Sequence, residues 1–384
     1  MADPELVRAY NDGRYLIALV DFGVELLFLV GFLALGWHRR LWARLSRFHK
    51  APSGRTGQAL ARVLGPEFRA ALLFAAAFLL LEYLVGLPVS IWSRAHGIAY
   101  GLATDDWARW SGDQLKAVAL GLPLTLLLVA GLFPLARRLP RTWWLALGLG
   151  AGLVLLAYQA VAPYQVHLYH RLEPLAQRRP ELAEQVVALA RRAGVSLGEV
   201  LVVDAGRVTA ALDAYVAGRG PSRRLVLFDT LIDSAPEPEI LAAVAHELGH
   251  RLEEDPWHEA LLGVLGAVAV FGLVKLLLAA LRRIKRLRVG PDNDPVNLPA
   301  LFLCLALTVT LFSLAGNALS RDRERAADRR AVELLGDPAP LLALYDRLAA
   351  RNLADPDPPA WVVLLMYDHP PMSERRSLVR TRGR

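Results

Sequence analysis

The chain has 384 residues, of which 54% are hydrophobic and 21% are charged, with a formal net charge of +7. Soluble proteins carry about 25% charged residues, so this composition excludes a disordered or fibrous chain and disfavours a purely soluble one. The single cysteine, Cys304, excludes an internal disulfide framework and a metal site built from several thiolates. The basic residues lie beside apolar runs, as at a membrane surface. We therefore expect a lipid bilayer, and not a nucleic acid, as the partner.

Apolar residues are gathered into runs long enough to cross a bilayer, which takes roughly 20 residues in a helix. The six runs are Tyr15–Trp37, Ala70–Trp92, Leu115–Ala136, Thr142–Ala162, Trp257–Leu281 and Val296–Leu319. The first run is interpreted as a span rather than a signal peptide, because acidic residues stand where a basic segment belongs. The sequence therefore predicts a mainly α, multi-pass membrane protein with about six transmembrane helices, four of them in residues 1–164.

Between the fourth and fifth runs the chain becomes charged and mixed, as in a small α+β domain over residues 165–256. Periodicity predicts helices over Pro180–Ala193 and Glu237–Glu254 and short strands over Glu199–Val203, Asp213–Gly218 and Arg224–Asp229.

A second soluble segment, residues 320–384, follows a membrane hairpin over residues 257–319. Its hydrophobic periodicity predicts helices over Ser320–Leu335 and Pro340–Asn352, and its prolines predict a break over Asp355–Pro359. We expect the two soluble segments to meet at one site.

One short motif carries chemistry, His246-Glu247-Leu248-Gly249-His250, within an apolar helical stretch. Residues four apart share a helix face, so both imidazoles can bind one metal ion, and neutral nitrogens suit zinc. Glu247 can act as the general base, since a metal lowers the pKa of its water towards about 7. The alternative, histidines that only cap a helix or face lipid headgroups, does not explain the interleaved glutamate.

A catalytic zinc site takes a third protein ligand, and the best candidates follow the sixth run. Glu324 and Asp328 are one turn apart on the expected helix, so one can bind the metal while the other supports a ligand histidine. The alternative is a solvated helix start laced with salt bridges.

The motifs HELGH, SRDRERAAD and DHPPMSER together resemble the type I CAAX prenyl endopeptidase family over about Leu87 to Leu378. Members are integral-membrane zinc metalloproteases related to the bacterial heat-shock membrane protease. The resemblance implies one Zn²⁺ per chain, bound by His246, His250 and Glu324, with Glu247 as base. It further implies catalytic or supporting roles for Asp328, Asn317, Arg321 and His369, the last contacting the substrate backbone or scissile carbonyl.

The same resemblance makes Ala211–Gly218 an exposed edge strand that pairs with an extended peptide substrate through Asp213, Ala214 and Tyr215. Asp213 stands where the family has asparagine, and a carboxylate donates no hydrogen bond unless it is protonated.

Loop charges predict the orientation, because basic loops favour the cytoplasmic side. Basic residues fill the first, third and fifth loops: Arg39, Arg40, Arg44, Arg47, Lys50, Arg55; Arg137, Arg138, Arg141; Arg282, Arg283, Lys285, Arg286 and Arg288. In a six-span protein of the cell (inner) membrane, these loops place the site outside the cytoplasm. Eukaryotic members resemble this chain with one additional span, and their site faces the cytosol.

Acidic residues inside the spans, Asp21, Glu25 and Glu82, indicate either a hydrated cavity or hydrogen bonds between helices. The function predicted is a zinc-dependent membrane endopeptidase acting on a peptide or membrane protein. Two alternatives remain open: a quality-control protease without prenyl specificity, and a transporter or channel with a structural zinc site.

Overall fold

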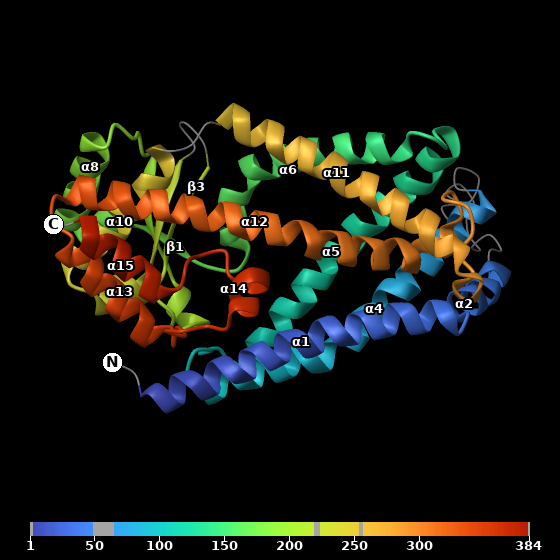
Figure 1. Ribbon diagram of the computed structural model, residues 1–384, viewed down its shortest axis with the longest axis horizontal. Coiled ribbons are helices and arrows are strands. Elements are labelled where there is room, and N and C mark those ends of the chain that lie inside the picture. Colours follow the sequence, from blue (N-terminus) through green and yellow to red (C-terminus); the bar gives the residue numbers. More distant parts are fainter. Residues whose placement is uncertain (1–2, 49–64, 219–222, 253–255, 383–384) are drawn as a thin grey trace.

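Six long helices form the body of the protein (Figure 1). The computed structural model describes residues 3–48, 65–218, 223–252 and 256–382. The long helices are α1 (Pro4–Ala34), α4 (Pro66–Ala99), α5 (Trp107–Arg138), α6 (Trp143–Gln165), α11 (Pro256–Arg283) and α12 (Leu298–Leu335). Within the described residues, five are long and apolar enough to cross a membrane, and α6 contains a shorter apolar segment, Trp143–Tyr158. They correspond to the six predicted spans, so the predicted multi-pass, mainly α fold is confirmed.

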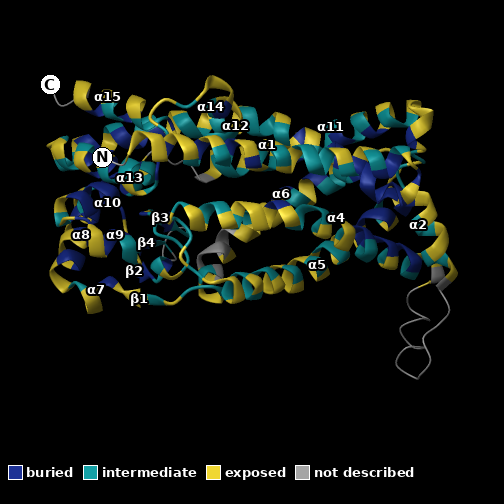
Figure 2. Ribbon diagram, turned by 90° about the horizontal axis from the view of Figure 1, so that it is seen from below, coloured by how far each residue is buried: buried dark blue, intermediate teal, exposed yellow. Residues whose placement is uncertain are grey.

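Large apolar side chains cover the outside of the helix bundle. Leu115, Leu127, Leu153 and Leu276 are each between 64% and 70% exposed, and Figure 2 shows exposed residues along much of α5 and α6. Contiguous apolar surface of this kind is rare in soluble monomers and is stable where lipid tails cover it.

Glycines let α6 and α11 approach closely. A Cβ at Gly148 would lie 2.6 Å from Val268 Cα, and one at Gly152 would lie 2.9 Å from Val264 Cα. Small residues at this spacing are typical of helix contacts within membranes.

The shorter elements lie at the two ends of the bundle (Figure 1). At the end away from the chain termini lie α2 (Trp37–Leu45), η1 (Ser46–Phe48), η5 (Lys285–Leu287) and η6 (Pro295–Asn297). The remaining elements are η2 (Val166–Leu168), β1 (Leu172–Pro174), α7 (Leu175–Arg178), α8 (Pro180–Arg192), β2 (Glu199–Val203), η3 (Ala205–Arg207), β3 (Ala214–Ala217), β4 (Arg224–Phe228), α9 (Asp229–Ser234), α10 (Glu237–Leu252), α13 (Ala339–Arg351), α14 (Ala360–Met366) and α15 (Met372–Arg382).

A small sheet lies beside α10, with the strand order β1-β2-β4-β3. β2 and β4 are parallel, whereas β1 and β3 are antiparallel to their neighbours and form the two edges. The three predicted strands are confirmed. β1 was not predicted, because three residues are too few to show strand periodicity.

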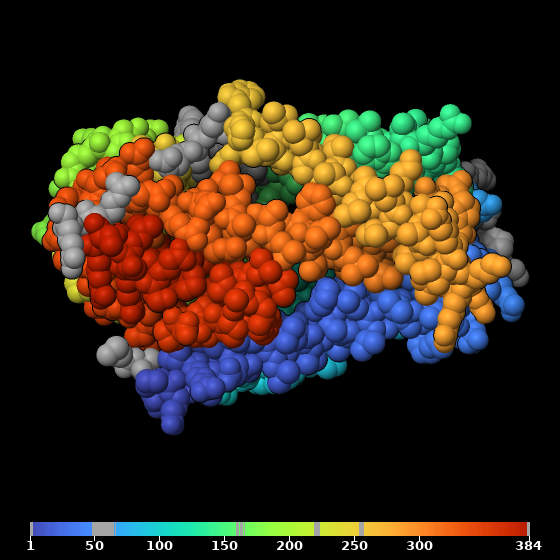
Figure 3. Space-filling view, viewed as in Figure 1, coloured from blue at the N-terminus to red at the C-terminus, as the bar shows by residue number. Residues whose placement is uncertain are grey.

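The two soluble segments share one hydrophobic core. Leu182, Leu225, Val244 and Tyr345 are buried in it, so α8, the sheet, α10 and α13 pack together. α12 is one continuous helix of 38 residues, so the sixth span and the predicted helix Ser320–Leu335 form a single rod that ends beside α10. The surface is hollowed between α11 and α12 on one face (Figure 3).

Candidate metal centre

Helix α10 directs two histidines towards α12. His246 and His250 are one turn apart, and their ring centroids are 4.7 Å apart in an edge-to-face arrangement. His246 is 8% exposed, while His250 is partly exposed. Burial on an apolar helix holds the first ring in one place, which favours a preformed ligand position.

Glu324 on α12 completes a set of three ligand atoms. Its carboxylate oxygens lie 3.3 Å from Nε2 of His246 and 3.1 Å from Nε2 of His250. Ligands at about 2.0–2.2 Å from a tetrahedral zinc ion are about 3.3 Å from one another, so these separations fit such an ion. Oε2 of Glu324 is buried and accepts no hydrogen bond from the described residues, as expected of an oxygen that binds a cation.

Glu247 offers a second possible carboxylate ligand. Its oxygen and the nitrogens of His246 and His250 lie within 4.8 Å of one another. Glu324 fits a ligand better, because its two oxygens lie within 3.3 Å of the Nε2 atoms of both rings and its carboxylate is buried. Glu247 then remains beside the two histidines without binding the metal, where its carboxylate can accept and donate a proton.

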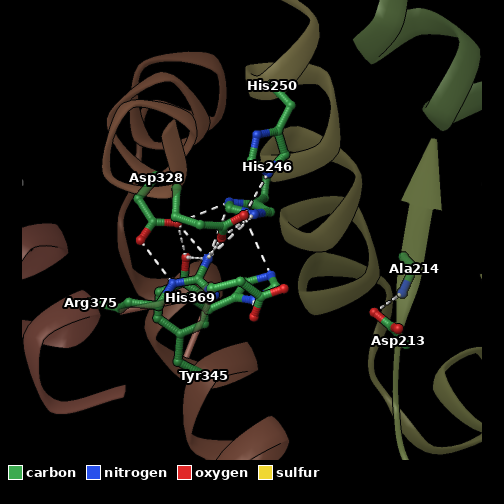
Figure 4. A network of polar contacts seen from close by, with 10 residues as sticks. Asp213, Ala214, His246, His250, Asp328, Tyr345, His369 and Arg375 are labelled. Carbon is green, nitrogen blue, oxygen red and sulfur yellow. Dashed lines mark hydrogen bonds and ion pairs between the residues drawn. The ribbon is translucent and has the colours of Figure 1, made fainter. Parts of the chain in front are cut away.

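A buried network orients His246 (Figure 4). Asp328 Oδ1 lies 2.9 Å from Nδ1 of His246, on the ring nitrogen that does not face Glu324. A carboxylate there places the ring proton on Nδ1, so that the lone pair of Nε2 is available to a metal. Arg375 Nη2 also lies 3.3 Å from Nε2. Asp328 is 0% exposed, so its charge needs a partner within the protein.

Arg375 on α15 is that partner. Its Nε and Nη2 donate to the two oxygens of Asp328 at 2.9 and 2.6 Å, and Nη2 also donates to the Tyr345 hydroxyl at 2.9 Å. The Tyr345 hydroxyl in turn donates to Asp328. Neither Arg375 nor Tyr345 is among the site residues predicted from the sequence. The only sequence signal for Arg375 is its place in the DHPPMSER motif.

The site favours positive charge. Burial and Arg375 lower the pKa of His246, but hydrogen bonds to Asp328 and Glu324 outweigh them and raise it to about 9. The same two carboxylates would stabilise a metal cation between the histidines.

His369 approaches the site from the segment between α14 and α15. Its Nε2 lies 3.4 Å from Glu324 Oε1, and its Nδ1 lies 2.8 Å from Asp368 Oδ1. The hydrogen bond to Asp368 raises the pKa of His369. Its side chain is 54% exposed, so it can reach a substrate.

Asn317 and Arg321 contact the segment that carries His369 rather than the ligand side chains. Asn317 Nδ2 donates to the Leu365 carbonyl at 3.0 Å. Arg321 Nη1 donates to the carbonyls of Val363 and Tyr367 at 2.9 and 2.6 Å. The two residues therefore anchor α14, and through it His369, to α12.

β3 borders the same pocket with one edge unpaired by any described strand. Phe228 donates its N–H to the Asp213 carbonyl at 3.1 Å, so Ala214 and Val216 direct their backbone groups to the open edge, as alternation requires. The Asp213 carboxylate accepts from the Ala214 N–H at 2.8 Å, and burial raises the pKa of Asp213 to about 6. Asp213 and Ala214 line the pocket with His246 and Glu247. Tyr215 belongs to β3 but points its backbone towards β4.

A helix of the H-E-x-x-H kind held against a membrane bundle is the arrangement of an integral-membrane metallopeptidase. Comparisons with known proteins agree. Residues 176–382 match peptidase family M48, and residues 5–167 match the CAAX prenyl protease N-terminal region, described as having five membrane helices. The chain belongs to peptidase family M48 and is a membrane metalloendopeptidase. Within residues 5–167 the structure describes four long helices, α1, α4, α5 and α6, and the short α2.

Relatives with several different names are similar to this chain in sequence. An uncharacterised metalloprotease of Bacillus subtilis, YhfN, is 30% identical over 302 residues, which is 77% of this chain and 70% of the relative. A CAAX prenyl protease 1 homologue of Dictyostelium discoideum is 29% identical over 226 residues, 58% of this chain and 52% of the relative. A protease HtpX homologue of Trichormus variabilis is 29% identical over 275 residues, 67% of this chain and 88% of the relative.

The fold matches a solved structure. The crystal structure of S. mikatae Ste24p superposes with a TM-score of 0.81 at 21% identity, covering 97% of this chain and 88% of that one. The six-helix bundle and the small sheet are therefore a known arrangement.

Proposed function

We propose that this chain is a zinc-dependent endopeptidase of the cell membrane, with His246, His250 and Glu324 as ligands of one Zn²⁺ and Glu247 as the general base. The observation that carries the proposal is the set of ligand separations, 3.3 and 3.1 Å, between side chains of two helices. The buried Oε2 of Glu324, which accepts no hydrogen bond from the described part of the chain, supports the proposal.

Each side chain has a distinct task. When bound, zinc lowers the pKa of a water molecule and polarises the scissile carbonyl. Glu247, which lines the pocket, accepts a proton from the attacking water and returns it to the leaving amine. His369 donates an N–H to the carbonyl oxygen as that atom gains negative charge. Asp328 keeps the His246 ring oriented, and β3 holds the peptide extended through backbone hydrogen bonds.

Glu247→Gln tests the assignment of the base. The variant should retain one zinc per chain, while kcat/KM for a peptide falls by at least about 10²-fold, because the amide cannot accept a proton. Zinc is measured by elemental analysis of the purified protein in detergent, and cleavage is measured with and without a chelator. Glu181→Gln, a change of an exposed glutamate on α8, is the matched control. Undiminished cleavage by Glu247→Gln would overturn the role of Glu247.

The substrate is the second part of the proposal. Relatives carry the names CAAX prenyl protease 1 and protease HtpX, so a processing enzyme and a quality-control enzyme are both candidates. Cleavage of a farnesylated C-a-a-X peptide is compared with that of the unmodified peptide. A preference for the farnesylated peptide supports processing, and equal rates support quality control.

A further inference from the structure

The open edge of β3 presents the backbone groups of alternate residues, Leu212, Ala214 and Val216. The residues between them face β4, as the Asp213 C=O shows by accepting from the Phe228 N–H at 3.1 Å. Each residue of the open edge therefore offers one N–H and one C=O to an added strand. An extended peptide is held through groups of this kind, so the groups that are already occupied decide where a peptide can pair.

Asn352, at the end of α13, covers the edge at Leu212. The Leu212 N–H donates to Asn352 Oδ1 at 2.9 Å, and Asn352 Nδ2 donates to the Leu212 C=O at 3.1 Å. The side-chain amide thereby makes both hydrogen bonds that a residue of a neighbouring antiparallel strand would make. A peptide cannot pair with Leu212 unless this amide moves away.

The surroundings of Asn352 hold it in place. Its backbone N–H donates to the Leu348 C=O at 2.9 Å. The next residue, Leu353, is 6% exposed and has a φ of +49°, a conformation that residues other than glycine rarely adopt. The Leu353 C=O accepts from Nδ2 of the buried Asn11 on α1 at 2.7 Å. The amide that covers Leu212 is therefore fixed by α13 and by the first membrane helix.

Arg251 covers the other end of the edge. It follows His250 on α10, and its Nη2 donates to the Val216 C=O at 2.7 Å. The guanidinium is charged, which makes this hydrogen bond stronger than one from a peptide N–H. A peptide that approaches this carbonyl must therefore displace a better donor than its own backbone supplies.

The middle of the edge is less occupied. The Ala214 N–H donates to Asp213 Oδ1 at 2.8 Å (Figure 4). The Ala214 C=O and the Val216 N–H have no hydrogen-bond partner among the described residues. Ala214 lines the proposed catalytic pocket together with Glu247. One N–H and one C=O of a peptide can therefore bind to the edge beside that pocket.

We propose that Asn352 and Arg251 delimit the peptide-binding edge of β3, so that a substrate pairs its backbone with the Ala214 C=O and the Val216 N–H alone. The proposal rests on the proposed endopeptidase function. Edge strands are commonly protected against pairing with other chains, and here the protection leaves a short opening beside the metal centre. Asn352 and Arg251 are thus positioning residues, because the opening sets which part of a peptide is held there.

N-methylation of one peptide nitrogen at a time tests the proposal, because each methyl group removes one N–H. The probe is a fluorescein-labelled casein peptide titrated into Glu247→Gln protein in neutral detergent. Within the paired stretch, methylation at one position should weaken binding about two- to tenfold, the range of one hydrogen bond. Adding Asn352→Ala should make a second position sensitive, two residues to one side, because the Leu212 C=O is then available. Adding Arg251→Ala should do so two residues to the other side, through the Val216 C=O.

Arg192→Ala is the matched control. Arg192 is an exposed arginine of α8 that also donates to a backbone carbonyl, that of Leu334, at 3.2 Å. Its loss should leave the pattern of sensitive positions unchanged, whereas a general loss of stability would weaken binding of all the peptides alike. An unchanged pattern in Asn352→Ala or in Arg251→Ala overturns the limit at that end. Sensitivity at all three alternate positions before either change, or no binding of any peptide, overturns the proposal as a whole.

Cleavage of the unmethylated peptide separates this proposal from the proposed function. It is measured with Glu247 intact, with and without a chelator. Chelator-sensitive cleavage together with unchanged methylation patterns overturns the delimited edge and leaves the endopeptidase intact. The expected methylation patterns without any such cleavage support the delimited edge and overturn the proposed endopeptidase.

Discussion

Arg375 links the proposed metal ligands to the core of the soluble region. It is 5% exposed, Asp328 is 0% exposed, and the two form paired hydrogen bonds at 2.9 and 2.6 Å. The neighbouring Arg376 instead pairs with Asp346 at 2.9 Å on a half-exposed surface. Two adjacent arginines thus have different tasks, one internal and one external.

Arg375→Met should loosen the metal site. The change leaves the Asp328 charge buried without its partner, which costs about 3–5 kcal/mol of folding stability. Loss of a group that orients a ligand lowers metal affinity about 10- to 100-fold. Thermal unfolding and competition with a chromophoric chelator measure the two effects. Arg375→Lys should retain part of the folding stability and part of the zinc affinity. Unchanged zinc affinity in Arg375→Met would show that Asp328 needs no counter-ion.

Asp213 should make substrate binding depend on pH. Burial raises its pKa to about 6, so below that pH the carboxyl is protonated and can donate to a substrate carbonyl as an asparagine amide would. As pH falls from 7.5 to 5.5, the KM of the unsubstituted protein relative to that of Asp213→Asn should fall about two- to tenfold, the value of one hydrogen bond. A KM ratio that is constant over this range would exclude such a contact.

At the scale of elements, the contact between α10 and α12 brings the ligands together. A Cβ at Gly249 would lie 2.7 Å from the Ala327 carbonyl oxygen and 3.1 Å from Ala327 Cα, which are backbone atoms that cannot rotate away. The glycine therefore permits the approach that puts Glu324 beside His246 and His250.

Gly249→Ala should push the two helices apart. Overpacking of this kind costs typically about 1–3 kcal/mol, and the displaced Glu324 should lower the zinc content of the purified protein and its chelator-sensitive cleavage together. Gly316→Ala on α12, where a Cβ meets nothing within 4 Å, is the control and should change neither. Full zinc occupancy in Gly249→Ala would mean that α12 adjusts without moving the carboxylate.

At the scale of the whole molecule, the described residues of the basic loops and the metal site lie at opposite ends (Figure 1). Lys50 and Arg55 of the first loop lie outside the described residues. α2 and its neighbours occupy the end away from the termini, where Arg39 donates to the Arg288 carbonyl at 2.9 Å. The site and both termini lie at the other end. Because basic loops favour the cytoplasmic side, we propose that the site faces the opposite side of the membrane, as the loop charges predict.

Cysteine labelling tests this orientation. In a Cys304→Ala background, Ser377→Cys on α15 should react with a membrane-impermeant maleimide in intact cells. Arg286→Cys, at the basic end, should react only after permeabilisation. Both positions are exposed, so access depends on the membrane alone, and the reverse pattern would place the site in the cytoplasm.

Local patterns in the sequence were sufficient to predict the membrane spans, the three longer strands and the helix that carries His246 and His250. Run length predicts a membrane helix and the spacing of His246 and His250 predicts a shared face, since both depend only on neighbouring residues. The three-residue β1 has too little pattern to be predicted.

Only the tertiary structure decided which polar groups are buried and which lack partners. Arg375 and Arg376 are the same residue type at adjacent positions, yet Arg375 is buried against Asp328 and Arg376 pairs with the exposed Asp346. Their tasks arise from helices far apart in sequence that pack together. The cost of burying a charge depends on that packing and not on the local pattern.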